Sequence, residues 1–294
     1  MVAGIEGRSQ LGPCAFATAL HRDHEKDRLG KVTDAGRVLV ITGAGVSAES
    51  GIPTFRGEDG YWRNLDPAKL ATPEAFARDP KLVWEWYRER RQCIRNAQPN
   101  AAHAAIAKLA QRAGDLLLVT QNVDDLHARA GLPKEKMVQI HGDIFLSRCS
   151  RCDWRAELCD AEERGTRNNS GLAGARPSTG PNEHEIQQTD LPYCARCHAL
   201  MRPGVVWFGE QLPWDEVRRV EDYLGRGACD LVIVAGTTAT FGYIIDWALR
   251  ASTDGGQLIE VNPDETPVST FATQRIHEPA AIALPRLIDQ ICNP

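Results

Sequence analysis

The segment that most constrains the fold of this chain is residues 43–57, GAGVSAESGIPTFRG, which directly follows the apolar, β-branched run 37–42. A buried strand that leads into a Gly-x-Gly turn is one way in which an α/β protein places backbone N–H groups against a phosphate. Gly43 and Gly45 can take positive φ values, and they leave no Cβ in the path of a ligand. The dinucleotide-binding fingerprint is incomplete, because its third glycine is missing and any helix would soon meet Gly51. The segment is therefore predicted to be a loop that wraps around a ligand.

The length and charge of the chain exclude several classes of protein. The chain has 294 residues, of which 43% are hydrophobic, and its net charge is −5. This length suffices for one large α/β domain and a smaller module. The negative charge argues against a general nucleic-acid binder, which would carry a basic face. It suits a lysine-rich partner, but most cytosolic proteins are mildly acidic as well. No run approaches the roughly 20 apolar residues of a membrane helix, and no secretory or transit pattern is present. We expect a cytoplasmic monomer with no nucleic-acid or membrane partner.

Apolar runs alternate with helical patterns along most of the chain. Strands are expected at 37–42, 116–120, 137–140, 205–208, 231–235 and 258–261. Helices are expected at 15–29, 73–77, 80–95 and 101–113, the last capped by Asn100. Continuous apolar strands separated by helices predict a parallel sheet with helices on both faces, as in a Rossmann-like α/β domain.

Composition divides the chain into parts. Residues 1–146 and 203–294 are predicted to form one discontinuous Rossmann-like domain, which includes a helical module at about 57–100. Residues 147–202 interrupt this domain and contain most of the closely spaced cysteines. Within this module, 163–185 is rich in Gly, Ser, Asn, Pro and Arg, which predicts a flexible insert.

Four of the nine cysteines form two Cys-x-x-Cys pairs, Cys149 with Cys152 and Cys194 with Cys197. In a reducing compartment such pairs are better explained by metal ligation than by disulfides. Four thiolates suit one structural Zn²⁺ in a closed tetrahedral site, which predicts a small zinc-ribbon module. Residues 153–193 exceed the usual spacing of about 15–20, but the cost of closing a long loop grows only slowly with its length. Cys159 and His198 are alternative ligands, and unrelated cysteines are the simplest competing explanation.

Polar residues follow two of the predicted strands. The string QNVDDLH, residues 121–127, comes directly after the strand at 116–120, and His141-Gly142 ends the strand at 137–140. Ligands of open α/β sheets bind at the carboxyl ends of strands, so these side chains are expected to share one crevice. A single histidine is more often a structural residue, but its place at a strand end favours a catalytic role.

Several strings together resemble one family. They are 43–57, 121–127, His141-Gly142, Arg202-Pro203 with the following VVWFGE, Gly236-Thr237-Thr238 and Glu260-Val261-Asn262-Pro263. In this order they are similar to the motifs of the sirtuins, the NAD-dependent protein lysine deacylases. The resemblance covers roughly residues 37–285. It implies a Rossmann-like fold with NAD as co-substrate and acylated-lysine proteins or peptides as partners.

The resemblance also implies roles for individual residues. The catalytic group comprises His141, Asn122 and Asp124. The residues implied in NAD binding are Gly43, Ala44, Gly45, Ser47, Glu49, Pro53, Thr54, Phe55, Arg56, Tyr61, Trp62, Gln121, Asn122, Val123, Asp124, Gly236, Thr237, Thr238, Asn262, Pro263, Asp264 and Ala280. The backbone of Val206, Trp207, Phe208, Gly209 and Glu210 is implied in binding the substrate peptide as an added strand.

The implied reaction consumes NAD. Nicotinamide leaves, the acyl-lysine oxygen attacks the ribose, and His141 deprotonates a ribose hydroxyl, a task that suits a group with a pKa near neutrality. The acyl group ends on ADP-ribose and free lysine is released.

One pair of residues bears on the acyl group. Tyr87 and Arg90 lie three apart on the predicted helix 80–95 and therefore share a face. They resemble the Tyr-x-x-Arg motif of class III sirtuins, which implies a clamp for the carboxylate of a succinyl, malonyl or glutaryl chain. A solvated arginine beside a half-buried tyrosine is the competing explanation, and Arg88 and Arg91 make the register ambiguous.

The chain departs from the family pattern in two places. Residues 238–243 lack the proline that the family often carries, and Gly204 stands where relatives often have histidine. Two other functions stay open. An NAD glycohydrolase or ADP-ribosyltransferase would keep the NAD loop without needing the peptide strand, and a non-catalytic zinc-ribbon interaction module would not bind NAD.

Overall fold

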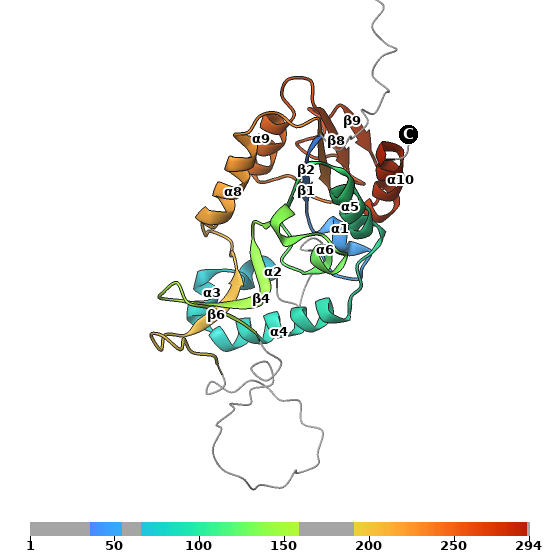
Figure 1. Ribbon diagram of the computed structural model, residues 1–294. Helices are drawn as coiled ribbons and strands as arrows, with labels where there is room; N and C mark the ends of the chain where they lie inside the picture. Colours follow the sequence, from blue (N-terminus) through green and yellow to red (C-terminus); the bar gives the residue numbers. More distant parts are fainter. Residues whose placement is uncertain (1–35, 55–65, 159–190, 293–294) are drawn as a thin grey trace, which may run out of the picture.

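The computed structural model describes residues 36–54, 66–158 and 191–292 (Figure 1). Within them lies a six-stranded parallel sheet in the order β3-β2-β1-β7-β8-β9. Its strands are β1 (Arg37–Thr42), β2 (Asp115–Thr120), β3 (Met137–Gln139), β7 (Leu231–Ala235), β8 (Gln257–Val261) and β9 (Gln274–Ile276). The predicted parallel sheet is confirmed. The expected helix at 15–29 and the insert at 163–185 lie outside the described residues.

Helices cover both faces of this sheet. Val38 and Val40 of β1 pack in one apolar core with α5 (Ala101–Arg112) and α10 (Ala280–Cys292). Leu39 and Ile41 point to the other core, which contains α8 (Trp214–Leu224) and α9 (Gly242–Ala251). Figure 1 shows these two pairs of helices on opposite sides of the sheet. Because successive residues of a strand face opposite sides, a strand buried on both faces must be apolar throughout.

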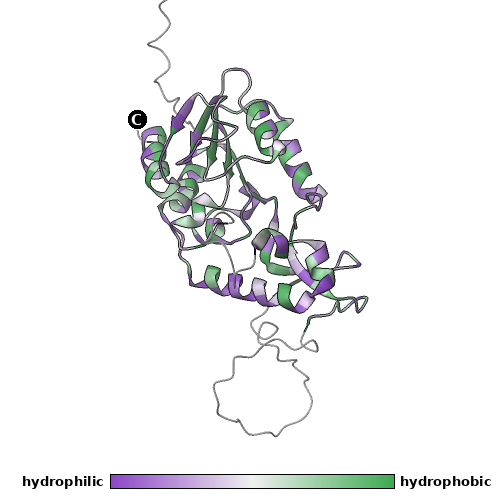
Figure 2. Ribbon diagram, turned by 180° about the vertical axis from the view of Figure 1, so that it is seen from behind, coloured by the Kyte–Doolittle hydropathy of each residue, from purple (hydrophilic) through white to green (hydrophobic). Residues whose placement is uncertain are grey.

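A helical module precedes the second strand. It contains α2 (Pro67–Leu70), α3 (Pro73–Arg78) and α4 (Pro80–Asn96). The side chains of Thr72 and Asp79 cap α3 and α4, and each of these helices begins with a proline, which suits a first turn because it needs no N–H there. Asn100 caps α5 in the same way, as predicted. In Figure 2 helix α4 alternates between hydrophilic and hydrophobic colours along its length, as expected for a helix with one buried face.

Short helical turns complete the connections, namely α1 (Gly45–Ala48), α6 (Leu126–Arg129) and the 3₁₀ turn η2 (Lys134–Lys136). None of the described helices is both long enough and apolar enough to span a bilayer.

A second, antiparallel sheet has the order β5-β4-β6. Its strands are β4 (Gly142–Cys149), β5 (Arg155–Glu157) and β6 (Met201–Val205). The predicted strand at 205–208 is wrong: β6 ends at Val205 and pairs with β4 rather than with the parallel sheet. A run of β-branched and aromatic residues suits a strand. However, the amide of Phe208 donates to the Ala71 carbonyl, and that of Glu210 donates to the Trp207 carbonyl, which closes a turn.

The division of the chain at residues 147 and 202 stays a prediction. β4 runs continuously from Gly142 to Cys149, and β6 begins at Met201, so the small sheet connects the two predicted parts through its strands. α4 packs against both strands in a third apolar core.

Candidate active site

The turn after β1 packs directly against the turn after β7. The amide of Gly45 donates to the Gly236 carbonyl at 2.8 Å, and a Cβ added to Gly45 or Gly43 would lie 2.8 Å from that same oxygen. Neither Gly43 nor Gly45 has a positive φ, whereas Gly236 has a φ of 58°. Neither of these two glycines therefore uses its freedom to take a positive φ. Glycine is required here because two backbones approach closely.

Side chains from two strand ends form a buried polar cluster. The Ser47 hydroxyl donates to Asp124 Oδ2 at 3.0 Å and accepts from Asn122 Nδ2 at 3.1 Å. All three side chains are buried. Burial raises the pKa of Asp124, while hydrogen bonds from the Leu126 amide and the Ser47 hydroxyl oppose this shift. The family resemblance implied all three residues in NAD binding, and the structure brings their side chains into contact.

Two histidines that sequence reasoning did not assign as site residues adjoin this cluster. His103 Nε2 lies 3.4 Å from Ser47 Oγ, and the rings of His103 and His127 are 4.7 Å apart. Burial lowers the pKa of His103 to about 4 and also lowers that of His127. His103 lies three residues after the helix cap Asn100 and closes a capping box with it. That Asn-x-x-His spacing marks the start of a helix, but by itself it does not reveal that His103 is buried beside Ser47.

His141 lies between the end of β3 and the start of β4, and both of its ring nitrogens have hydrogen-bond partners. Nδ1 lies 2.9 Å from the Gln121 carbonyl, which can only accept, so Nδ1 carries the proton. Nε2 is then the acceptor, and the Tyr243 hydroxyl donates to it at 2.6 Å. Burial lowers the pKa of His141, and the bond to Gln121 opposes that shift. The neutral imidazole is therefore favoured, as a general base requires.

The other described residues of the predicted NAD set follow the same strand ends. Gln121 Nε2 donates to Thr237 Oγ1 at 2.8 Å, which joins the loops after β2 and β7. Asn262 follows β8, and its side chain donates to the Asp264 carbonyl. The strands are parallel, so these loops emerge at one edge of the sheet. Also on loops or turns after these strands are Ala44, Glu49, Pro53, Thr54, Val123, Thr238 and Pro263.

Other members of the predicted NAD set differ in placement. Ala280 is buried at the start of α10. The predicted NAD contacts Phe55, Arg56, Tyr61 and Trp62 lie outside the described residues.

Tyr87 and Arg90 share one face of α4, as the spacing predicted. Tyr87 is 4% exposed, and Trp207 Nε1 donates to its hydroxyl at 3.0 Å. Burial raises the pKa of Tyr87 to about 12, opposed by the nearby charge of Arg90. Burial also lowers the pKa of Arg90, whose guanidinium carbon lies 5.2 Å from the Trp86 ring centroid. Arg91 instead lies over Trp84, which places Arg90 and not Arg91 beside the phenol.

The predicted peptide-binding segment, residues 206–210, is a turn. Its Val206 amide donates to the His141 carbonyl, and its Trp207 amide donates to Glu210 Oε2 at 2.8 Å. Glu210 also pairs with Arg202, whose guanidinium carbon lies 3.3 Å from the Trp207 ring centroid. Most N–H groups of the segment therefore bind within the protein.

The four cysteine sulfurs lie within 4.8 Å of one another. The sulfurs of Cys149 and Cys197 are 3.4 Å apart, and those of Cys152 and Cys194 are 3.7 Å apart. Zn–S bonds of about 2.3 Å in a tetrahedron would place sulfurs about 3.8 Å apart. The donor set therefore fits a structural Zn²⁺ with no open position. His198, one of the two alternative ligands, is not part of this four-cysteine group. The other, Cys159, is not among the residues that the structure describes.

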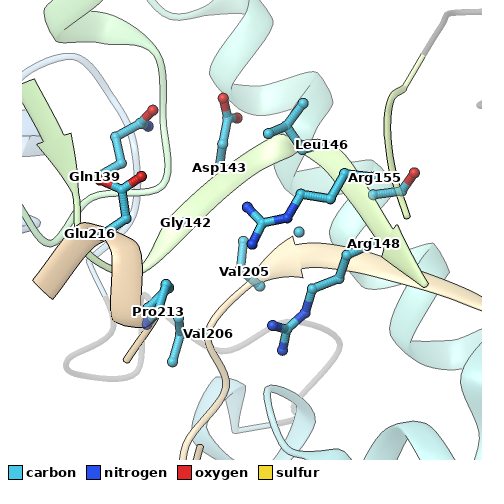
Figure 3. A pocket seen from close by; sticks show the side chains of 12 residues that line it. Gln139, Gly142, Asp143, Leu146, Arg148, Arg155, Val205, Val206, Pro213 and Glu216 are labelled. Carbon is cyan, nitrogen blue, oxygen red and sulfur yellow. The ribbon is translucent and has the colours of Figure 1, made fainter. Parts of the chain in front are cut away.

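A hollow of about 120 Å³ lies beside the small sheet (Figure 3). It is lined by residues of β4, β5, β6 and the start of α8, including Gly142, Arg148, Arg155, Val205 and Glu216. Of the predicted site residues only Val206 contributes to it. This hollow is therefore distinct from the polar cluster around Ser47.

Comparisons with known proteins point to one family. Residues 43–241 match the Sir2 family model. The chain is 41% identical over 258 residues to an NAD-dependent protein deacylase of Aquifex aeolicus, a match that covers 86% of this chain and 95% of the relative. It is 38% identical to the NAD-dependent protein deacylase sirtuin-5A, mitochondrial, of Xenopus laevis, over 96% of this chain and 91% of the relative.

Solved structures give the same assignment. A crystal structure of a Sir2 homolog–NAD complex superposes with a TM-score of 0.71 at 40% identity and covers 88% of this chain and 91% of that one. A structure of Sir2Tm bound to a propionylated peptide superposes with a TM-score of 0.67 at 27% identity, over 86% of this chain and 92% of that one. The chain belongs to the Sir2 family, the sirtuins.

Proposed function

We propose that this chain is an NAD-dependent protein-lysine deacylase that releases nicotinamide and transfers the acyl group to ADP-ribose. One observation carries the proposal: a neutral histidine with a hydrogen-bond-accepting Nε2 lies at the same sheet edge as the buried Ser47–Asn122–Asp124 cluster. Relatives that match nearly the whole chain are NAD-dependent protein deacylases by name.

The residues at the sheet edge suit NAD. The amides of Gly43 and Gly45 bind the Ala235 and Gly236 carbonyls, so the donors proposed for the diphosphate and riboses are the Ala44 amide and the Thr237 hydroxyl. Asn122 and Asp124 offer amide and carboxylate groups for the nicotinamide end. When bound, NAD supplies the ribose carbon that receives the acyl oxygen. His141 would accept a proton at Nε2, since its Nδ1 proton is held by Gln121.

We propose an acidic acyl chain as a preferred substrate, alongside acetyl-lysine. The Tyr87 hydroxyl accepts from Trp207, which leaves its own proton for a ligand carboxylate. Arg90 adds a positive charge next to that hydroxyl. A protonated phenol beside a guanidinium suits a terminal carboxylate such as that of succinyl-lysine or malonyl-lysine. Val206 and Gly209 in the turn at 206–210 are proposed to contact the peptide backbone.

A panel of matched peptides tests this function. Acetyl-, propionyl-, malonyl-, succinyl- and glutaryl-lysine peptides are incubated with NAD, and both nicotinamide and deacylated peptide are measured. We expect the two products to form in equal amounts. Nicotinamide release that does not depend on acyl peptide would instead identify an NAD glycohydrolase or ADP-ribosyltransferase.

His141→Ala is the matched control for the panel. It should retain NAD binding and lose activity by at least about a hundredfold, the usual contribution of a general base. Turnover above a few per cent of the parent rate would contradict the assignment of His141.

The four cysteines suit a structural zinc that is held as thiolates in a reducing compartment. This supports our proposal that the enzyme acts in the cytoplasm. We further propose that it is a monomer that acts on acylated proteins, and its net charge of −5 argues against a nucleic-acid partner.

A further inference from the structure

Tyr243 lies in the first turn of α9, within the segment 238–243 where the chain departs from the family pattern. Its ring stacks on Phe241 with centroids 5.6 Å apart and an interplanar angle of 14°. The centroid of the buried Trp247 ring lies 5.0 Å from that of Tyr243. These two contacts hold the ring so that its hydroxyl reaches Nε2 of His141 at 2.6 Å.

The direction of this hydrogen bond follows from the other ring nitrogen. The His141 Nδ1–H is held by the Gln121 carbonyl, so Nε2 offers a lone pair and the tyrosine must donate. A hydrogen bond to the neutral form of a base favours that form. The His141 ring also contacts the ring of Phe241. No described carboxylate, lysine or arginine contributes to the pKa of His141. Tyr243 is therefore the titratable partner that faces the base.

We propose that Tyr243 is a positioning residue for His141: its hydroxyl donates to Nε2 of the ligand-free enzyme, holds the ring neutral, and yields that place to the substrate hydroxyl. The inference rests on the proposed function, because it takes His141 as the base. Nε2 has one lone pair, so Tyr243 and a substrate hydroxyl cannot both donate to it.

The proton transfer itself does not pass through Tyr243. In the complex the substrate O–H bond breaks and the Nε2–H bond forms, which leaves a substrate alkoxide and an imidazolium. Tyr243 keeps its own proton throughout, because burial raises the pKa of its phenol.

Tyr243→Phe removes the hydroxyl and keeps the ring between Phe241 and Trp247. A neutral hydrogen bond contributes about 0.5–1.5 kcal/mol, which corresponds to about 0.4–1 pH unit. The acidic limb of the kcat/KM profile reports the free enzyme and should move to higher pH by that amount, whereas the limb of kcat reports the complex and should stay in place. Tyr193→Phe, which alters an exposed tyrosine near the cysteine cluster, should shift neither limb.

A second measurement needs no activity. In ligand-free protein with ¹⁵N-labelled histidine, an NMR titration should show a pKa for His141 that is higher in Tyr243→Phe than in the parent by the same 0.4–1 unit. An unchanged His141 pKa would overturn the inference. So would a fall in kcat of tenfold or more at every pH, because the hydroxyl would then take part in the proton transfer. If the protein deacylates none of the peptides, the proposed function is contradicted. The NMR titration still tests the role of Tyr243 in that case, because it requires no activity.

Discussion

Tyr87 owes its position to a series of contacts between side chains that are distant from α4 in sequence. Glu210 pairs with Arg202, the Arg202 guanidinium stacks on Trp207, and Trp207 Nε1 donates to the Tyr87 hydroxyl. Each of these groups is buried or half-buried, so water competes little for the hydrogen bonds. The phenol is therefore held in one orientation before any substrate arrives, which lowers the entropy cost of binding an acyl chain.

Arg90→Met tests the carboxylate clamp. The charge-assisted contact to an acidic acyl chain contributes roughly 1.5–3 kcal/mol, so the ratio of kcat/KM for succinyl- over acetyl-peptide should fall about tenfold to hundredfold. Arg88→Met, two residues away on the same helix and therefore on a different face, should leave the ratio unchanged. An equal loss on both peptides would show that Arg90 has a structural role.

Contacts between secondary-structure elements explain why particular residues stand at positions for which the local sequence motifs give no reason. The turns after β1 and β7 meet through Gly45 and Gly236, and a Cβ on Gly236 would lie 2.4 Å from the Val46 amide nitrogen. In the small module, β4 supplies Cys149 at its end, and β6 follows the second cysteine pair, so the metal ligands connect two segments that are distant in the chain.

Gly45→Ala should destabilise the fold. Its Cβ would be only 2.8 Å from the Gly236 carbonyl oxygen, and overpacking of this kind typically lowers the free energy of unfolding by about 1–3 kcal/mol. Gly242→Ala is the matched control, because a Cβ there meets nothing within 4 Å. Urea unfolding of both variants measures the difference, and equal stability of the two would contradict the close-packing explanation.

Cys194→Ser should release about one zinc per chain and lower the thermal midpoint, because structural zinc contributes directly to the free energy of folding. Cys292→Ser, at the end of α10 and outside the cluster, should retain the metal. Metal analysis by mass spectrometry measures both. An absence of zinc from the parent protein, or full retention in Cys194→Ser, would reject the site.

At the scale of the whole molecule, two neutral histidines are buried close to the polar cluster around Ser47. His103 and His127 are both buried, and burial lowers both pKa values below the ordinary 6.5. Protonation therefore favours the unfolded chain. Stability is fully present above pH 6.5, where the unfolded histidines are also neutral, and it is lost as the pH falls from 6.5 toward the folded value of about 4 for His103.

His103→Gln should weaken this acid sensitivity. The parent should lose up to about 3 kcal/mol through His103 between pH 7 and pH 4, whereas the variant lacks this contribution. Urea unfolding at a series of pH values measures the slope for each protein. Identical slopes would show that His103 does not titrate differently in the two states.

Much of the architecture follows from local sequence. The runs 37–42, 231–235 and 258–261 are largely apolar because both faces of their strands are buried, and they form parallel strands as predicted. The cysteine spacing predicted a four-sulfur cluster, and the polar string after β2 predicted that Asn122 and Asp124 lie at the sheet edge. These features depend on periodicity and spacing within short segments.

Other features were decided only by tertiary structure. The strand predicted at 205–208 failed because strand pattern is local, whereas its pairing with β4 and the turn closed by Glu210 depend on distant residues. Gly43 and Gly45 are glycines because of a backbone 190 residues away in the chain, which no single motif reveals. Tyr243 and His141 are 102 residues apart and meet only when α9 packs on the sheet. Local sequence determines which elements form, and packing between them determines which side chains touch.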